Sequence, residues 1–188
     1  MKILFLDFDG VMCLSTEWGG RTKKKIKYWR DFPGTESENL PAWVKMDNFN
    51  DKAVNVLNSI LEQTGAEIVV SSDWKLYCTL DELKEMFTKY GVIKQPIDTT
   101  PNIPLKYDKS YYTKGELAEY RTIEVKQWLK DHPEVTHWVA VDDLPLGETF
   151  GPISGNSNGG LTNFVLTPKS SEGIKQSGIK EKILKFLL

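Results

Sequence analysis

A short apolar run that ends in two acidic residues is the feature that most constrains the fold of this chain. Residues 3–11 read I-L-F-L-D-F-D-G-V, so four apolar residues lead directly into Asp7 and Asp9, and Gly10 ends the run. Such a run is typical of a strand that is buried on both faces of a sheet. Side chains alternate along a strand, so Asp7 and Asp9 point to the same side at its carboxyl end. Because adjacent carboxylates are costly unless a cation or a proton compensates them, the run indicates a metal site that also carries out chemistry.

Two other interpretations of the run have to be weighed. An Asp-x-Asp-Gly sequence also begins the calcium loop of an EF-hand, which needs a Glu at its twelfth position and a helix in front of it. Counted from Asp7, the twelfth residue is Trp18, and the residues before Asp7 are strand-like. The remaining alternative is a strand-to-turn transition with acidic capping residues and no site. The other motifs of the chain bear on the choice.

The rest of the chain alternates between apolar runs and amphipathic segments. Further strands are predicted at 67–72, 137–141 and 164–166, and helices at 51–64, 79–91, 121–130 and 179–187. Strands that alternate with helices imply a parallel sheet with right-handed crossovers and helices on both faces. The expected fold class is therefore α/β, a Rossmann-like three-layer sandwich with a mainly parallel sheet.

Three segments show no such pattern. Residues 12–49 are polar and aromatic with Pro and Gly breakers and are interpreted as a loop or hairpin, residues 95–120 as irregular, and residues 151–160 as a flexible glycine-rich span. With 188 residues the chain is expected to form a single domain over 1–188, with small or minimal cap insertions at about 12–49 and 95–120.

Polar residues follow three of the predicted strands. The first strand leads into Asp7 and Asp9, the second ends at Ser71, and the third runs into Asp142 and Asp143. In a parallel sheet the carboxyl ends of the strands lie along one edge, which is where ligands bind in open α/β sheets. Three such endings at one edge favour a functional site over simple capping.

These motifs resemble those of the haloacid dehalogenase (HAD) superfamily of phosphohydrolases. Its first motif is matched by the sequence at 7–10, its second by Ser71, and its fourth by Asp142 and Asp143. The Ser-Ser-x-Trp-Lys sequence at 71–75 is further similar to the phosphatase-like domains of RNA-repair and polynucleotide-kinase proteins. The resemblance covers nearly the whole chain and implies a phosphatase.

The resemblance also implies a role for each motif residue. Asp7 would attack phosphorus and form an aspartyl-phosphate, and Asp9 would protonate the leaving oxygen and then activate water. Ser71 would donate a hydrogen bond to a phosphoryl oxygen. Mg²⁺ would be held by Asp7, the backbone carbonyl of Asp9 and Asp143, with Asp142 in support.

The third motif and the substrate contacts are less sharply defined. The superfamily places a Lys or Arg near the start of the helix before the acidic strand, and Arg121 fits that position best, with Lys114 and Lys126 as competitors. The remaining residues expected to bind the substrate are Gly10, Ser72 and Lys75.

Two segments bear on the substrate. Residues 21–30 read R-T-K-K-K-I-K-Y-W-R, with six cations and no acid, although the whole chain has a formal net charge of −2. Residues 106–121 combine basic residues with four tyrosines. Either segment could contact a nucleic-acid strand, or could simply be a solvated or packed cap. The expected activity is Mg²⁺-dependent hydrolysis of a phosphomonoester, on a nucleic-acid or nucleotide terminal phosphate. A phosphatase for small metabolites and a repair-accessory protein with a vestigial site are the alternatives.

The remaining observations concern the setting of the protein. Cys13 and Cys78 form neither a metal-ligand spacing nor a disulfide framework, and His132 and His137 are interpreted as structural. The apolar run that ends at Asp7 is too short for a signal peptide, and no stretch is long enough to span a membrane. A monomeric, cytoplasmic protein with no membrane partner is expected.

Overall fold

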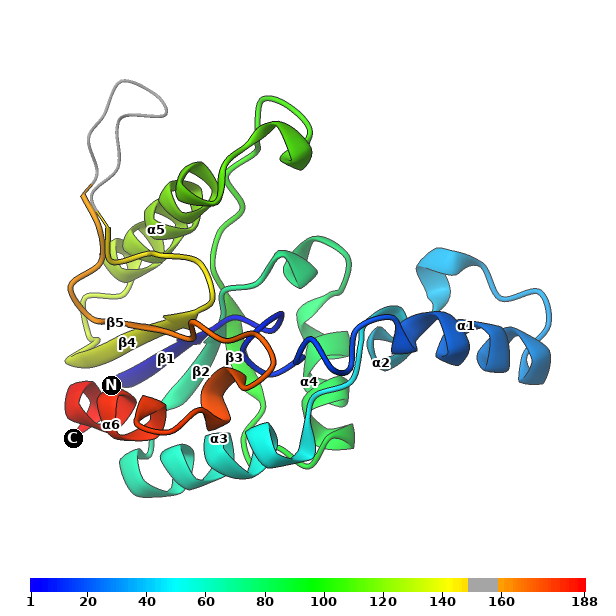
Figure 1. Ribbon diagram of the computed structural model, residues 1–188, viewed down its shortest axis with the longest axis horizontal. Coiled ribbons are helices and arrows are strands. Elements are labelled where there is room, and N and C mark those ends of the chain that lie inside the picture. The colour runs from blue at the N-terminus through cyan, green and yellow to red at the C-terminus, as the bar shows by residue number, and fades with distance from the viewer. Residues whose placement is uncertain (149–158) are drawn as a thin grey trace.

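A five-stranded, all-parallel sheet forms the centre of the computed structural model, which describes residues 1–148 and 159–188 (Figure 1). The strand order is β3-β2-β1-β4-β5. The strands are β1 (Lys2–Leu6), β2 (Glu67–Val70), β3 (Pro96–Thr99), β4 (His137–Asp142) and β5 (Phe164–Leu166). The predicted α/β fold class is confirmed, and so are the four predicted strands, while β3 is an additional edge strand.

Helices cover both faces of the sheet and give the predicted three layers (Figure 1). The α-helices in the described part of the chain are α1 (Gly20–Asp31), α2 (Ala42–Lys45), α3 (Asp51–Thr64), α4 (Leu80–Lys89), α5 (Lys114–Asp131) and α6 (Ile179–Leu187). Helices α3, α4 and α6 pack on one face, and α5 packs on the other. None of these helices is both long and apolar enough to cross a membrane.

The central strand β1 explains why the apolar run precedes the acidic residues. It pairs with β2 on one side and β4 on the other. Leu4 and Leu6 pack toward α3 and α6, whereas Ile3 and Phe5 pack toward α5, and all four are fully buried. Both faces of the strand must therefore be apolar, and the first position that can carry a charge is the one after the strand ends.

The segment 12–49 was expected to lack helices, and this prediction was wrong. It contains α1, a short 3-10 helix η1 (Ser37–Asn39) and α2. Helix α1 has no buried residue and projects away from the sheet (Figure 1), so it has no apolar stripe that a sequence pattern could reveal. The breakers at 33–34 and 41 lie beyond its last residue, Asp31.

The segment 95–120 is also more regular than expected. It contains β3, a 3-10 helix η3 (Lys109–Tyr111) and the first two turns of α5, which begins at Lys114 rather than at Arg121. The start of α5 is marked by a capping box in which Thr113 and Glu116 bond to each other's backbone N–H groups. The flexible span predicted at 151–160 lies outside the described residues, apart from its last two positions.

Candidate active site

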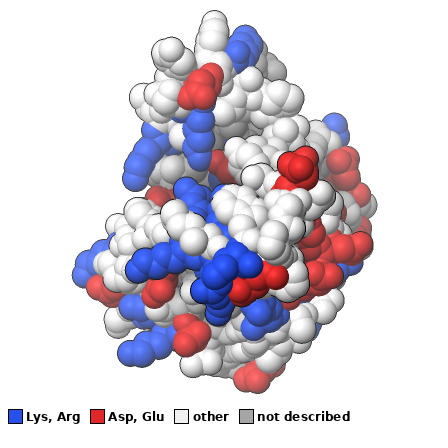
Figure 2. All heavy atoms as spheres, turned by 90° about the vertical axis from the view of Figure 1, so that its right-hand side faces the viewer, with Lys and Arg blue, Asp and Glu red and all other residues white. Residues whose placement is uncertain are grey.

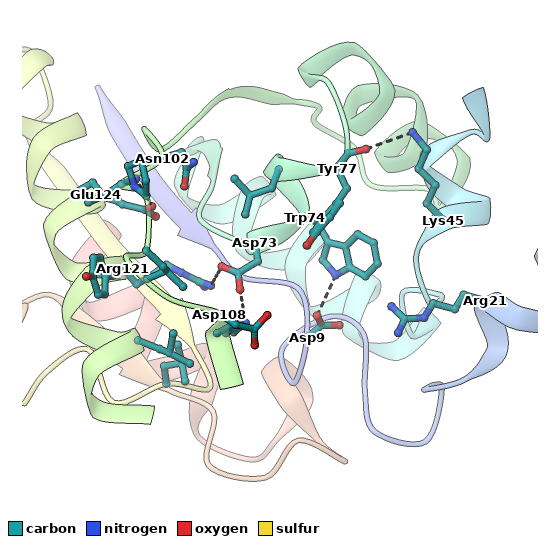
Figure 3. Close-up of a pocket in the computed structure, with 18 of the residues that line it drawn as sticks. Asp9, Arg21, Lys45, Asp73, Trp74, Tyr77, Asn102, Asp108, Arg121 and Glu124 are labelled. Carbon is teal, nitrogen blue, oxygen red and sulfur yellow. Dashed lines mark hydrogen bonds and ion pairs between the residues drawn. The ribbon is translucent and has the colours of Figure 1, made fainter. Parts of the chain in front are cut away.

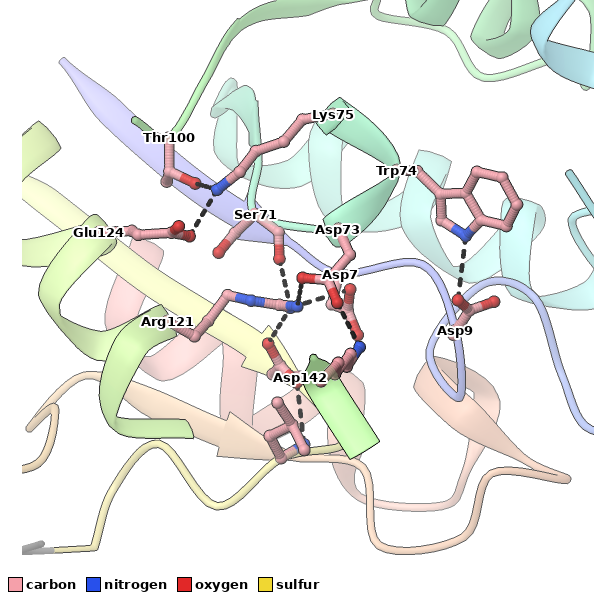
Figure 4. A network of polar contacts seen from close by, with 12 residues as sticks. Asp7, Asp9, Ser71, Asp73, Trp74, Lys75, Thr100, Arg121, Glu124 and Asp142 are labelled. Carbon is pink, nitrogen blue, oxygen red and sulfur yellow. Dashed lines mark hydrogen bonds and ion pairs between the residues drawn. The ribbon is translucent and has the colours of Figure 1, made fainter. Parts of the chain in front are cut away.

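The carboxyl ends of β1, β2 and β4 bring the predicted acidic residues together (Figure 4). Asp7 follows β1 directly and its N–H donates to the carbonyl of Val141 at 3.1 Å. Asp142 is the last residue of β4, and Asp143 follows it. Carboxylate oxygens of Asp7, Asp142 and Asp143 all lie within 4.8 Å of one another. The parallel register therefore builds one acidic cluster from residues far apart in sequence.

Arg121 lies at the centre of the cluster, reaching in from α5 (Figure 4). Its Nη1 lies 3.0 Å from Asp7 Oδ1 and 2.8 Å from Asp142 Oδ2, and donates to the carbonyl of Ser71 at 2.6 Å. Its Nη2 lies 2.7 Å from Asp73 Oδ1. The guanidinium is buried, and these acids raise its pKa well above the usual value in spite of burial. Arg121 therefore stays charged and neutralises part of the cluster.

The helix start predicted for the motif-three cation is occupied by Lys114 rather than Arg121. Lys114 is the exposed first residue of α5, and its charge lowers the pKa of Asp143, so it lies near the rim of the cluster. Lys126 donates to the carbonyl of Gly159 at 3.1 Å, on another part of α5. Among the three predicted candidates, Arg121 is the one that contacts Asp7 directly.

Two serines after β2 line the cluster. The N–H of Ser71 donates to the carbonyl of Leu6 at 3.0 Å, which fixes Ser71 beside the end of β1. Its hydroxyl is buried and has no hydrogen-bond partner in the described part of the chain. The hydroxyl of Ser72 hydrogen-bonds to Asp7, which favours the charged form of that carboxylate. An unsatisfied buried hydroxyl is costly, so Ser71 is suited to bind an oxygen-rich ligand at this point.

Asp9 lies at the edge of the cluster. One of its oxygens, Oδ2, accepts a hydrogen bond from Trp74 Nε1 at 2.9 Å (Figures 3 and 4). Trp74 belongs to the 3-10 helix η2 (Asp73–Leu76) that follows Ser72. The Asp9 carboxylate is not one of the three that converge.

Burial and mutual repulsion raise the pKa values of these acids. Burial raises the pKa of Asp7, while the Arg121 cation opposes that rise. For Asp9 and Asp142, burial and then the charge of Asp7 raise the pKa. The same two causes raise the pKa of Asp143 to about 6. The repulsion indicates that the cluster needs more positive charge than Arg121 supplies.

The donor set fits a hard divalent cation. Carboxylate oxygens are the ligands that Mg²⁺ prefers. Both oxygens of Asp142 are already occupied, by Arg121 and by the N–H of Leu144 at 2.8 Å. The carboxylate of Asp143 accepts no hydrogen bond from any described residue. The Asp7 carboxylate already pairs with Arg121 and with the Ser72 hydroxyl. Asp143 is therefore the acid of the cluster whose oxygens are bonded to no other described residue, and Asp142 holds Arg121 in place.

Gly10 allows Asp143 to approach the loop after β1. Its φ is +73°, and a Cβ built on it would lie 2.9 Å from the Asp143 carboxylate oxygen. The carbonyl of Gly10 accepts a hydrogen bond from Thr167 at 3.1 Å. Only glycine combines this backbone conformation with this close contact. The structure thus places Gly10 against the acidic cluster, as a packing residue.

The structure does not bring Lys75 to the cluster, although a substrate contact was predicted for it. Its ammonium lies 2.5 Å from Glu124 Oε2 and donates to Thr100 Oγ1 at 2.8 Å and to the carbonyl of Pro101 at 3.1 Å (Figure 4). The pair is buried, and Glu124 also accepts the N–H of Ile103 at 3.0 Å. Lys75 therefore ties η2 to α5 and to the loop after β3.

Four site residues were missed by the sequence analysis: Asp73, Trp74, Lys109 and Glu124. Asp73 joins Arg121 to Lys109, which comes from η3 in the second insert. Burial raises the pKa of Asp73, but Arg121 and Lys109 outweigh that and lower it. Asp73 and Trp74 are the variable position and the Trp of the Ser-Ser-x-Trp-Lys sequence at 71–75. That sequence was the signal by which both residues could have been found. Lys109 lies in the basic, tyrosine-rich segment 106–121, which was expected to contact a substrate rather than to pair with Asp73.

An open cleft of about 950 Å³ extends from Arg121, beside the acidic cluster, to the first insert (Figure 3). Its lining includes Asp9, Asp73, Trp74 and Arg121 on the sheet side. Both inserts line it as well, the first through α1 and the second through the segment 102–109. The cleft is wide enough for a ligand considerably larger than phosphate.

Comparison with known proteins identifies one family. Residues 3–177 match the model of a family described as the HAD domain in Swiss Army Knife RNA repair proteins. Searches of curated proteins and of solved structures returned no match. The family match covers β1 to η4 and therefore every residue of the cluster described above.

Proposed function

The chain belongs to the family of HAD domains in Swiss Army Knife RNA repair proteins, and we propose that it is a Mg²⁺-dependent phosphomonoesterase acting through an aspartyl-phosphate. The observation that carries the proposal is the juxtaposition of Asp7 with an unpartnered buried hydroxyl and a buried cation. In this proposal Ser71 and Arg121 bind phosphoryl oxygens and developing charge, and Arg121 contacts both Ser71 and Asp7 (Figure 4).

In the first step an oxygen of the Asp7 carboxylate attacks phosphorus, and the bond between phosphorus and the leaving oxygen breaks. A carboxylate needs no base to act as a nucleophile. Burial raises the pKa of Asp7, and Arg121 and Ser72 oppose that rise. Asp9 gives a proton to the leaving oxygen. The raised pKa of Asp9 supports this role, because it keeps a larger fraction of the carboxyl protonated.

In the second step Asp9, now a carboxylate, takes a proton from water. The water oxygen attacks phosphorus, and the bond to Asp7 breaks, which releases inorganic phosphate and restores the carboxylate. Trp74 holds one oxygen of Asp9 at 2.9 Å, so the other oxygen can serve both proton transfers. Arg121 stays charged throughout and stabilises the negative charge that moves between Asp7 and the phosphoryl group.

Asp7 and Asp143 would supply the side-chain ligands for Mg²⁺, and the carbonyl of Asp9 would be a further oxygen. When bound, the ion offsets the repulsion between Asp7 and a phosphate dianion and stabilises charge in the transfer. Asp142 contributes by fixing Arg121, since both of its oxygens are already engaged.

The substrate we propose is a nucleic-acid or nucleotide terminal phosphate. The cleft is open and large, and cations from both inserts line it, which suits an extended anionic substrate. The description of the family as part of RNA repair proteins points to the same class. A small sugar phosphate would leave most of this cleft unused.

The test is release of phosphate from an aryl phosphate and from end-phosphorylated RNA and DNA, with Mg²⁺ or with EDTA. Asp7→Asn is expected to lower kcat by about a thousandfold or more, since it removes the nucleophile. Asp81→Asn is the matched control, because that side chain is 91% exposed and lies on α4 away from the cleft. Full activity in Asp7→Asn would contradict the covalent mechanism, and full activity in EDTA would contradict the metal requirement.

A further inference from the structure

The far end of the cleft is formed by helix α1, a part of the chain that the chemistry of Asp7 does not use. Arg21 and Lys25 line it from α1, one helical turn apart, and Tyr77 lines it from the loop after η2 (Figure 3). The guanidinium of Arg21 lies 5.6 Å from the centre of the Trp74 ring. Since Trp74 also holds Asp9, this cation sits one side chain away from the proposed proton donor.

The cations of the cleft fall into two groups. Arg121 and Lys109 both pair with Asp73, and Lys45 pairs with Glu82 at 3.1 Å. The side chains of Arg21 and Lys25 form no ion pair with any residue that the structure describes. They are therefore the cations whose charge is available to a ligand.

The face that carries α1 is rich in basic side chains. Figure 2, viewed from the α1 end, shows Lys and Arg side chains gathered across its middle and Asp and Glu gathered along one edge. The cleft wall also includes Glu38 and Asp108, so the cleft is not uniformly basic.

Aromatic surface lies next to these cations. Tyr77 is 65% exposed, and its ring is 5.9 Å from that of Trp74 in an edge-to-face arrangement. Both side chains line the cleft. An exposed aromatic ring beside unpaired cations is the combination that binds single-stranded nucleic acid, where bases stack and phosphates meet the cations.

We infer that Arg21, Lys25 and Tyr77 form a second subsite that binds the phosphodiester and the base flanking the terminal phosphate. The inference rests on the proposed function and narrows it: the substrate is the end of a single-stranded oligonucleotide, and a free mononucleotide lacks the group that this subsite binds.

The experiment compares kcat/KM for a phosphorylated hexanucleotide, the matching mononucleotide and an aryl phosphate, with 5′ and 3′ phosphates tested separately. For one of the two ends we expect the wild type to prefer the hexanucleotide over the mononucleotide by about tenfold or more. The double variant Arg21→Ala/Lys25→Ala should lower the ratio of kcat/KM for the hexanucleotide to kcat/KM for the aryl phosphate by a similar factor. Tyr77→Ala should lower that ratio by about fivefold to a hundredfold.

Two matched controls distinguish binding at a specific subsite from a nonspecific effect of removing surface charge or an exposed tyrosine. Lys23→Ala/Lys27→Ala removes the same charge from the exposed side of the same helix, and neither residue lines the cleft. Tyr111→Ala removes a tyrosine that is 80% exposed outside the cleft. Both controls should keep the wild-type ratio. A ratio that falls equally in the control pair would overturn the subsite.

Binding to the inactive protein gives a second measurement. In an Asp7→Asn background, the affinity for a fluorescent phosphorylated hexanucleotide should depend on salt. Adding Arg21→Ala/Lys25→Ala removes the contacts to one phosphodiester and should reduce the slope of log K against log salt by about 0.7. Turnover of aryl phosphate with no preference for the hexanucleotide would overturn this inference alone. Absence of all turnover would overturn the proposed function, and the salt slope would then still decide whether the subsite exists.

Discussion

The guanidinium of Arg121 lies 3.0 Å from the carboxylate of Asp7, and both groups are buried. A cation from the middle of α5 thus faces the residue that directly follows β1. Its other acidic partners, Asp142 and Asp73, come from the end of β4 and from η2. Arg121 therefore connects β1, β4, η2 and α5, and the cluster depends on it for both charge and position.

Replacement of Arg121 should be costly for stability. Arg121→Met leaves buried carboxylates without their cation, and loss of one partner from a buried ion pair costs about 3–5 kcal/mol. Urea unfolding measures this free energy. Lys130→Met, an exposed change on the same helix, should alter it by about 0.5 kcal/mol or less. An Arg121→Met protein as stable as the wild type would show that the carboxylates carry little charge in the metal-free state.

The metal-free protein should become more stable as the pH falls from 7 toward 5. The pKa of Asp143 is about 6 in the folded state against 3.8 for a free carboxyl. Between these values the folded state binds more protons than the unfolded state, so stability falls as pH rises through this window. The contribution is on the order of 2 kcal/mol.

Urea unfolding in EDTA at pH 5 and pH 7 measures this dependence. The free energy of unfolding of Asp143→Asn should depend less on pH than that of the wild type, because the variant lacks the titrating carboxyl group. Added Mg²⁺ should raise stability more at pH 7 than at pH 5, since protons compete for the same oxygens. An unchanged pH dependence in Asp143→Asn would contradict the assignment.

Gly10→Ala should impair the site beyond its effect on the backbone. A residue with a Cβ in the left-handed region costs roughly 1–2 kcal/mol. At Gly10, with φ +73°, the new Cβ would also press on Asp143 and displace it. Gly34→Ala is the matched control, because Gly34 has φ +83° and nothing lies within 4 Å of a Cβ there. Both variants should lose similar stability, while stabilisation by Mg²⁺ should weaken in Gly10→Ala alone.

Phe5→Ala should destabilise the protein by about 3–5 kcal/mol, because it leaves a cavity between β1 and α5. Phe5 is fully buried, with ring centres 5.3 Å from Trp128 and 6.0 Å from Trp138. Phe32→Ala, at a position that is 57% exposed, should cost about 1 kcal/mol or less. Thermal or urea unfolding distinguishes the two, and equal losses would argue against Phe5 as a core residue.

The parts of the fold that the sequence predicted are those with a strong local pattern. The buried strand 3–6 has apolar residues on both faces, and α3 has a capping Asn50 and a regular apolar stripe. Helix α1 buries no residue, so no periodic signal existed for it. The capping box of Thr113 and Glu116 was a sequence signal for the start of α5. It was missed because the neighbouring residues are rich in tyrosine and lysine and were interpreted as irregular.

By itself the sequence determined where the acids stand along the strands, because a strand buried on both faces can change from apolar to charged only at its end. It also determined the parallel α/β architecture, through the alternation of strands and helices. Only the tertiary structure decided which side chains share the site. The positions of Trp74, Asp73 and Arg121 follow from how η2 and α5 pack against the sheet edge. The position of Lys75 could not be predicted from the sequence either. Its buried pair with Glu124 joins η2 to α5, and no local sequence pattern relates these two segments.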